Sequence, residues 1–186
     1  MKTDDELIEG YEAGDESAFS ELLDRYLDAV YSFALRLTGS KDDAEDVSQE
    51  TFLKAWKSLK RFRKGANFKT WLFAIARNAS IDSLRKKKPA LFGQLSWADG
   101  EEFEHGIADN APSADVLLDR DFSKGRLDEA LANIAPIYRE ILLLHYHEDM
   151  TLEEAALTLD IPLNTAKSRD RRALIALRKL LEPERA

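Results

Sequence analysis

The sequence predicts an all-α protein with two small helical domains joined by a flexible acidic linker, the C-terminal domain carrying a helix-turn-helix. Through most of the 186 residues, apolar side chains recur at intervals of three and four, and no segment alternates as a strand would. Between residues 89 and 112 this periodicity stops, and Gly, Pro and acids recur instead. We therefore expect domains at 1–88 and 123–186, with 89–122 as the linker and the entry to the second domain.

The first domain should contain a long helix over residues 19–37, where apolar side chains trace one face. Gly39 follows it, and glycine readily adopts the left-handed conformation that ends many helices. Ser40 can then cap a second helix that runs to about Leu59. Acids fill the first turn of this helix, where they interact favourably with the helix dipole.

A third helix is expected from Phe68 to about Lys88, after a basic loop at residues 61–67. Asn67 supplies its N-cap. Pro89 ends it, because proline disfavours helical geometry in the residue before it.

The second domain should open with a helix that Ser113 caps and that breaks at Gly125. Pro136 suits the first turn of the next helix, which continues through Tyr146. Residues 151–154 then form a capping box, in which a threonine hydroxyl and a glutamate three residues later satisfy each other's backbone N–H groups.

Helices at 152–159 and about 164–181, joined by about four residues, describe a helix-turn-helix. The side chains expected between them are Ala155, Ala156, Leu159, Ile161, Ala166, Ala173, Leu177 and Leu180. The outward face of the second helix would carry Asn164, Thr165, Lys167, Ser168, Arg169, Arg171, Arg172 and Arg178. Such a helix fits the major groove, where Arg and Lys read guanine or hold phosphates. A solvated basic face on a packing helix is the alternative.

Charge is sorted along the chain. Residues 1–53 have a net charge of -11 and residues 54–88 of +11, within a chain of net charge -8. Five rings lie among the cations of the basic segment: Trp56, Phe62, Phe68, Trp71 and Phe73. Cations attract phosphate and rings stack on unpaired bases, so this segment predicts a nucleic-acid surface suited to opened strands.

Several classes of function are disfavoured. The chain has no cysteine, hence no disulfide or thiolate metal site, and its histidines, His105, His145 and His147, do not suit a metal site. No Gly-rich phosphate loop or catalytic constellation appears, so we expect no cofactor and no enzymatic activity. The longest aliphatic run, residues 141–144, is too short for a membrane span, and the acidic N-terminus lacks a signal-peptide core, which predicts a cytoplasmic protein without membrane insertion.

Three stretches together resemble the extracytoplasmic-function (group four) sigma factors of bacterial RNA polymerase. DAEDVSQETFLKAW at 43–56 is similar to the family's polymerase-binding helix. FKTWLFAIARN at 68–78, with Asp82 and Arg85, is similar to its promoter-melting helix. PIYREILLL at 136–144 and the helix-turn-helix are similar to the domain that reads the upstream promoter element. The resemblance covers about 17–88 and 123–181.

The resemblance implies three surfaces. Polymerase-binding residues, facing the coiled coil of the largest subunit, would be Asp43, Asp46, Gln49, Glu50, Phe52 and Trp56. Residues that bind and open the minus-ten element would be Arg63, Lys64, Asn67, Lys69, Arg77, Asn78 and Arg85. The outward face of the last helix, from Asn164 to Arg172, would bind the minus-thirty-five element as duplex. Core packing is the alternative role for Phe52, Trp56 and Phe73, and especially for Trp71.

Two further partnerships follow from the resemblance. The acidic linker would pass through the cationic active-site and RNA-exit channels of core RNA polymerase. An anti-sigma protein would clamp the two domains and mask both DNA-binding faces. The implied function is promoter recognition and strand opening; a stand-alone helix-turn-helix regulator is the alternative.

The chain departs from the resemblance in the second domain. Members of the family often have Gly at the positions of Asp160 and Asn164. They often have a branched aliphatic residue at the positions of Ala155 and Ala166, and an aliphatic residue at the position of Asp170. Asp170 falls near the inner stripe of the last helix, so its carboxylate must be paired or close to water. These departures predict an unusual promoter sequence or an altered helix orientation.

Overall fold

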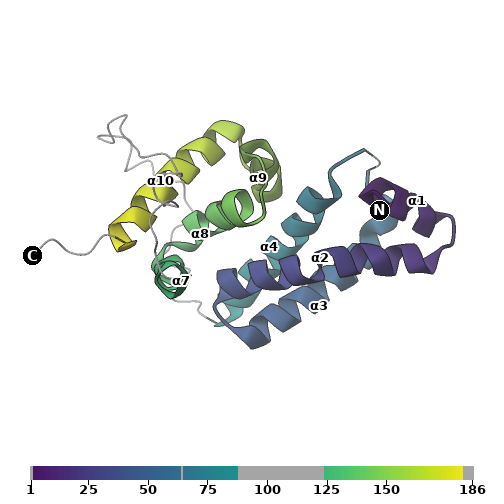
Figure 1. Cartoon of the computed structure of the whole chain (residues 1–186), viewed down its shortest axis with the longest axis horizontal. Helices are drawn as coiled ribbons and strands as arrows, with labels where there is room; N and C mark the ends of the chain where they lie inside the picture. Colours follow the sequence, from purple (N-terminus) through teal and green to yellow (C-terminus); the bar gives the residue numbers. More distant parts are fainter. Residues whose placement is uncertain (1, 64, 88–123, 182–186) are drawn as a thin grey trace, which may run out of the picture. The chain divides into compact units, whose positions relative to one another are not determined.

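The computed structural model describes residues 2–63, 65–87 and 124–181, and the regular structure within these ranges is helical. Two compact units result, one built on α1–α4 and the other on α7–α10 (Figure 1), and each is described by itself. The predicted linker, the Ser113 cap, Lys64 and Pro89 lie outside the described residues. In the described ranges, no helix is both long and apolar enough to cross a membrane.

The helix boundaries of the first unit follow local capping. Its elements are α1 (Asp4–Glu12), α2 (Glu16–Thr38), α3 (Lys41–Ser58), the 3₁₀ turn η1 (Leu59–Arg61) and α4 (Phe68–Lys87). Gly39 ends α2 with a φ of 75°, in the left-handed region. The Ser40 hydroxyl accepts the N–H of Asp43 at 3.3 Å, and Asn67 Oδ1 accepts the N–H of Thr70 at 3.1 Å. These three predicted helix ends are confirmed.

The periodicity does not predict α1, because this helix buries only Leu7 and Ile8 and is nine residues long. Its signal is a capping box. The N–H of Glu6 donates to the Thr3 hydroxyl at 3.2 Å, and the N–H of Thr3 donates to Glu6 Oε2 at 2.7 Å. Thr-x-x-Glu ahead of two aliphatic residues could therefore have located the helix from the sequence.

The core of the first unit lies between α2, α3 and α4. Phe33 of α2 meets Phe73 of α4 edge to face, with 5.4 Å between ring centroids, and both rings are fully buried. Other fully buried apolar side chains are Leu7, Leu22, Val30, Leu37, Val47, Leu59 and Leu72. The same packing fixes the outward faces of α3 and α4.

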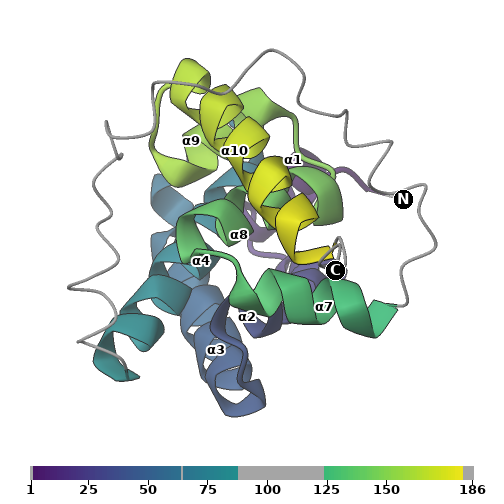
Figure 2. The ribbon, with the colours of Figure 1, turned by 90° about the vertical axis from the view of Figure 1, so that its left-hand side faces the viewer.

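The second unit contains α7 (Lys124–Asn133), α8 (Pro136–Leu142), the π-helical turn η3 (Leu143–His147), α9 (Leu152–Leu159) and α10 (Leu163–Leu181). α10 packs on α8 and α7 (Figure 2). The predicted capping box of α9 is confirmed: the N–H of Glu154 donates to Thr151 Oγ1 at 3.2 Å, and the N–H of Thr151 to Glu154 Oε2 at 2.8 Å. α7 begins at Lys124, one residue before Gly125, so the predicted break at Gly125 falls at the edge of the described residues and stays a prediction.

The core of the second unit confirms most of the predicted inner face. Ala155, Ala156, Leu159, Ala166, Ala173 and Leu177 are all buried. Leu180 is 48% exposed, contrary to the prediction, and Leu181 is buried in its place. Successive residues of a helix are rotated by about 100° around its axis, so Leu181 faces the core where Leu180 faces outward.

The second unit also buries a cation. Arg139 Nη2 donates to the carbonyl oxygens of Ala132 and Ile134, at 2.6 and 3.0 Å, and so satisfies groups at the end of α7. This ties the start of α8 to the helix before it.

Candidate polymerase and nucleic-acid interfaces

The outward face of α3 is acidic at its centre. Asp46, Gln49 and Glu50 are all exposed, as the resemblance requires. Phe52 is half-buried, while Trp56 keeps 50% of its surface exposed. An acidic face that ends in an exposed ring suits a basic protein partner, with the ring as an apolar anchor.

Asp43 does not belong to this face. Only 7% of it is exposed, and its Oδ1 accepts a hydrogen bond from Ser83 Oγ of α4 at 3.1 Å. The expectation that it faces outward is wrong, because Asp43, Val47 and Thr51 are four residues apart and share the buried stripe of α3.

The rings of the basic segment divide into core and surface. Phe62, Phe68 and Trp71 form a cluster with centroid separations between 5.1 and 5.7 Å. Phe62 and Phe68 are buried, whereas Trp71 lies partly exposed. For both Trp71 and Phe73, core packing is an alternative to DNA contact. Phe73 is fully buried, so it is a core residue. Trp71 is the one with surface left for a base.

Polar and cationic side chains follow Trp71 along α4. Trp71, Asn78 and Arg85 are spaced by seven residues, which places them along one line of the helix. Asn78 and Arg85 are exposed, and Asn78 Oδ1 accepts a hydrogen bond from Arg77 Nη1 at 3.2 Å. Lys69 Nζ lies 5.9 Å from the centroid of the Phe73 ring, in cation–π range.

The loop before α4 holds the other predicted minus-ten residues. Arg63 and Asn67 are both exposed, and Lys64 lies outside the described residues. Asn67 Oδ1 is engaged in capping α4, so a hydrogen bond that Asn67 donates would come from its amide nitrogen. Gly65 has a φ of 79°, a conformation that glycine adopts without strain, so it can turn the loop between these side chains.

The first turns of α10 present most of the predicted duplex-binding residues. Asn164 and Lys167 are exposed, and the remaining members are partly exposed: Thr165, Ser168, Arg171 and Arg172. Ser168 Oγ donates to the Thr165 carbonyl oxygen at 3.0 Å. A polar and basic face of this kind, following a short turn, is suited to the major groove.

Arg169 is the exception on α10. It is 7% exposed, and its Nη1 donates to Oε1 of the fully buried Glu140 of α8 at 3.2 Å. The prediction that it lies on the outward face is wrong. Its position is three residues after Ala166 and four before Ala173, which is the inner stripe of the helix.

Asp170 follows Arg169 into the interior, as its spacing predicts. Tyr146 donates a hydrogen bond to its Oδ2 at 3.3 Å, and Oδ1 has no hydrogen-bond partner among the described residues. Burial raises the pKa of the Asp170 carboxyl, and the effects of His145 and the Tyr146 hydroxyl offset only part of this. A carboxyl group here destabilises the packing of α10 when it is ionised.

Asp160 occupies the turn between α9 and α10 with a φ of 54°, in the left-handed region. Glycine adopts that conformation without strain, and Asp and Asn tolerate it better than most residues. The turn therefore keeps its helix-turn-helix geometry although no glycine is present.

Comparison with known proteins agrees with this two-unit arrangement. The Sigma-70 region 2 family model matches residues 22–89, and the Sigma-70, region 4 model matches residues 124–177. The ECF RNA polymerase sigma factor SigW of Bacillus subtilis is 32% identical over 94% of both chains. The RNA polymerase sigma-H factor of Pseudomonas aeruginosa is 30% identical over 98% of this chain and 96% of its own.

Solved structures show the same likeness. RpoE of Bartonella quintana, in complex with the anti-sigma factor NepR, is 30% identical with a TM-score of 0.67, covering 90% of this chain and 98% of its own. CnrH in complex with the cytosolic domain of CnrY is 25% identical with a TM-score of 0.69, covering 96% of each chain.

The two folds are those of a promoter-specificity subunit of RNA polymerase. The chain belongs to the extracytoplasmic-function sigma factors, alternative sigma factors that direct RNA polymerase to particular promoters.

Proposed function

We propose that this sigma factor divides polymerase binding, strand opening and duplex reading among three of its helices. The observation that carries the proposal is the pairing, within the first unit, of an exposed acidic face on α3 with exposed cations and a partly exposed ring on α4. Opposite charges on neighbouring helices suit two different partners, one basic and one a polyanion.

The outward face of α3 binds core polymerase through the coiled coil of its largest subunit. Asp46, Gln49 and Glu50 supply charge and hydrogen bonds, and Trp56 supplies an apolar anchor. Asp43 acts indirectly, by holding α3 on α4 through Ser83.

The loop at residues 61–67 and the line of Trp71, Asn78 and Arg85 bind the opened minus-ten strand. An unpaired base must recover the few kcal/mol that unstacking costs, and a partly exposed ring beside amide and cationic groups can supply stacking and hydrogen bonds. Arg63, Lys69 and Arg77 add attraction for the phosphates.

The exposed face of α10 binds the minus-thirty-five element as duplex, with Asn164, Lys167 and Arg171 among the contacts. An anti-sigma protein controls access to these faces, a proposal supported by the complex of the similar Bartonella quintana RpoE with NepR. The chain would act on the chromosome in the cytoplasm, without catalysing a reaction itself, because the polymerase supplies the chemistry.

Holoenzyme reconstituted from core polymerase and this chain tests the proposal. Selection from random promoter DNA should yield two conserved elements, and the downstream one should become reactive to a single-strand probe. Glu50→Lys should prevent holoenzyme assembly, and Arg63→Ala should leave assembly intact while slowing strand opening. Equal affinity of the chain for duplex with and without core polymerase would instead favour a stand-alone helix-turn-helix regulator.

A further inference from the structure

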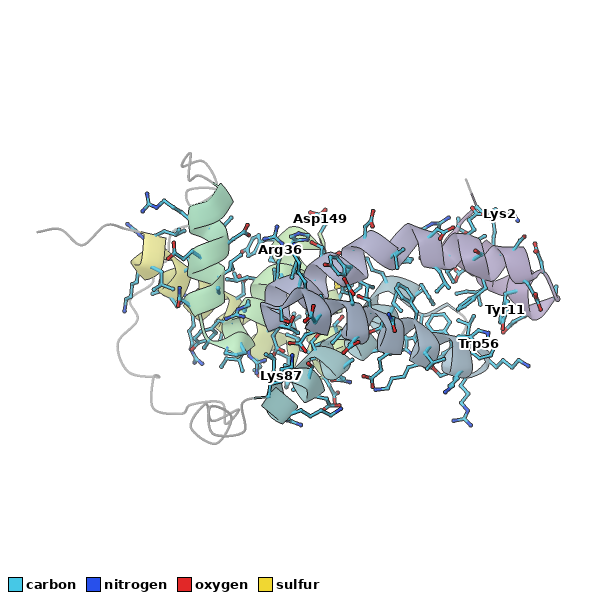
Figure 3. All side chains as sticks on the ribbon, turned by 90° about the horizontal axis from the view of Figure 1, so that it is seen from below. Lys2, Tyr11, Arg36, Trp56, Lys87 and Asp149 are labelled. Carbon is cyan, nitrogen blue, oxygen red and sulfur yellow. The ribbon has the colours of Figure 1, made fainter. Side chains whose placement is uncertain are left out.

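The exposed ring of α3 is held by a residue from α1. Trp56 Nε1 donates a hydrogen bond to the Tyr11 hydroxyl at 2.8 Å, and Figure 3 shows the two labelled side chains together at one end of the first unit. Trp56 is 50% exposed and Tyr11 partly exposed, so the pair lies at the surface. A surface tryptophan with a fixed indole direction is ready to enter a pocket on a partner.

Tyr11 itself stands on a well-anchored helix. Its ring packs on Phe19 of α2, with 5.1 Å between centroids. The Asp4 carboxylate accepts hydrogen bonds from Arg25 and Tyr26, both on α2. These contacts at both ends of α1 fasten it to α2, which in turn packs on α3, the helix that carries Trp56.

Between these contacts, α1 and α2 also approach each other closely. A Cβ on Gly10 would lie 3.2 Å from the Cβ of Ala18, tighter than an ordinary contact, so glycine at this position favours the close approach. α1 precedes residue 22, where the match to Sigma-70 region 2 begins. The support for Trp56 therefore comes from outside the part of the chain that the family model covers.

The surface around Trp56 presents an apolar patch that suits the packing face of an amphipathic partner helix. Leu53, 49% exposed, lies one helical turn before Trp56, and the exposed Glu50 lies one turn before Leu53. Glu50, which forms an ion pair with Lys54 at 2.6 Å, borders this apolar pair, whose exposed surface suits the packing face of the coiled coil in the proposed function.

We propose that Tyr11 is a positioning residue for polymerase binding, whose hydroxyl fixes the indole of Trp56 in the orientation that docks on the coiled coil. This rests on the proposed function of the α3 face. Holding the ring before binding removes part of the entropy cost of ordering it in the complex. One lost hydrogen bond of this kind should weaken binding roughly three- to tenfold.

The test measures the dissociation constant of core polymerase for the full-length chain and its variants. Tyr11→Phe removes only the hydroxyl and keeps the packing on Phe19, and Trp56→Phe removes the donor. Tyr31→Phe is the matched control, because Tyr31 packs beside Ala34 and Val47 and, within the described residues, its hydroxyl makes no hydrogen bond. The Trp56 indole N–H resonance of the free chain reports whether the bond exists in solution.

Tyr11→Phe should weaken binding roughly three- to tenfold and shift the Trp56 indole resonance, with no change for Tyr31→Phe. Adding Tyr11→Phe to Trp56→Phe should cost nothing more, because the two act through one bond. If Tyr11→Phe weakens binding equally in the unmodified chain and in the Trp56→Phe variant, Tyr11 does not act through Trp56 and the proposal is overturned. The proposal is also overturned if Tyr11→Phe leaves binding unchanged while Trp56→Ala weakens binding. If Trp56→Ala also binds normally, the proposed docking role of Trp56 fails as well.

Discussion

Arg169 of α10 donates a hydrogen bond from Nη1 to Oε1 of Glu140 on α8, at 3.2 Å, with both side chains buried. The pair joins the helix that carries the proposed duplex-binding face to the helix beneath it. We therefore expect Arg169 to act on the proposed duplex binding through the placement of α10 and not by direct contact.

Arg169→Ala should destabilise the second unit by about 3–5 kcal/mol, because it leaves the Glu140 carboxylate buried without its cation. Lys167→Ala, on the exposed face two residues earlier, should change stability by less than about 0.5 kcal/mol. Urea unfolding followed by circular dichroism measures both. Replacing the pair together, Arg169→Met with Glu140→Leu, should recover most of the loss; failure to do so would indicate that the charges have a further role.

Burial of Asp170 predicts a pH-dependent stability. Because burial in the folded state raises the pKa of this carboxyl above its ordinary value of 3.8, folding favours the protonated form. The stability that protonated Asp170 contributes is fully present below pH 3.8, and it is lost as pH rises through the pKa of the folded state. Asp170→Asn should therefore be more stable than the unmodified chain at pH 8, and the two should converge toward pH 4.

Urea midpoints measured between pH 4 and pH 8 for both chains would show this convergence. Asp128→Asn is the control, since Asp128 is an exposed acid on α7. A constant difference between Asp170→Asn and the unmodified chain across this range would mean that Asp170 does not titrate as its burial requires.

The turn residue Asp160 gives a conformational prediction. Because Asp160 has a φ of 54°, Asp160→Gly should relieve a backbone strain of up to about 1 kcal/mol. The greater entropy that glycine gives the unfolded chain should offset part of this gain in stability. Asp160→Val should destabilise by more than about 1 kcal/mol, because β-branched residues fit this region poorly. Thermal unfolding measures both, and a valine variant as stable as the glycine variant would show that the turn has another conformation in solution.

Local signals made much of this fold predictable. Gly39, Ser40 and Asn67 act at helix ends through their own backbone or the next few residues, so the sequence alone locates them. The resemblance predicts Asp43 on the polymerase-binding surface and Arg169 on the outward face of the last helix, yet each is buried against a partner distant in sequence, Ser83 and Glu140 respectively. Periodicity can place such a residue on the inner stripe, but only the packed structure supplies the group that makes burying it tolerable.

The exposed cation Lys167 gives a test of the duplex-binding face that does not depend on stability. If its ammonium group neutralises a phosphate, Lys167→Ala should lower the dependence of duplex affinity on salt, reducing the slope of log K against log[salt] by about 1. Lys179→Ala is the matched control, because Lys179 is exposed on the last turn of the same helix, far from the turn that enters the groove. Holoenzyme binding to fork-junction and duplex promoter fragments at several salt concentrations gives both slopes. Equal reductions for the two variants would point to diffuse attraction by the whole helix, whereas a change confined to Lys167→Ala would locate the phosphate contact at the start of α10.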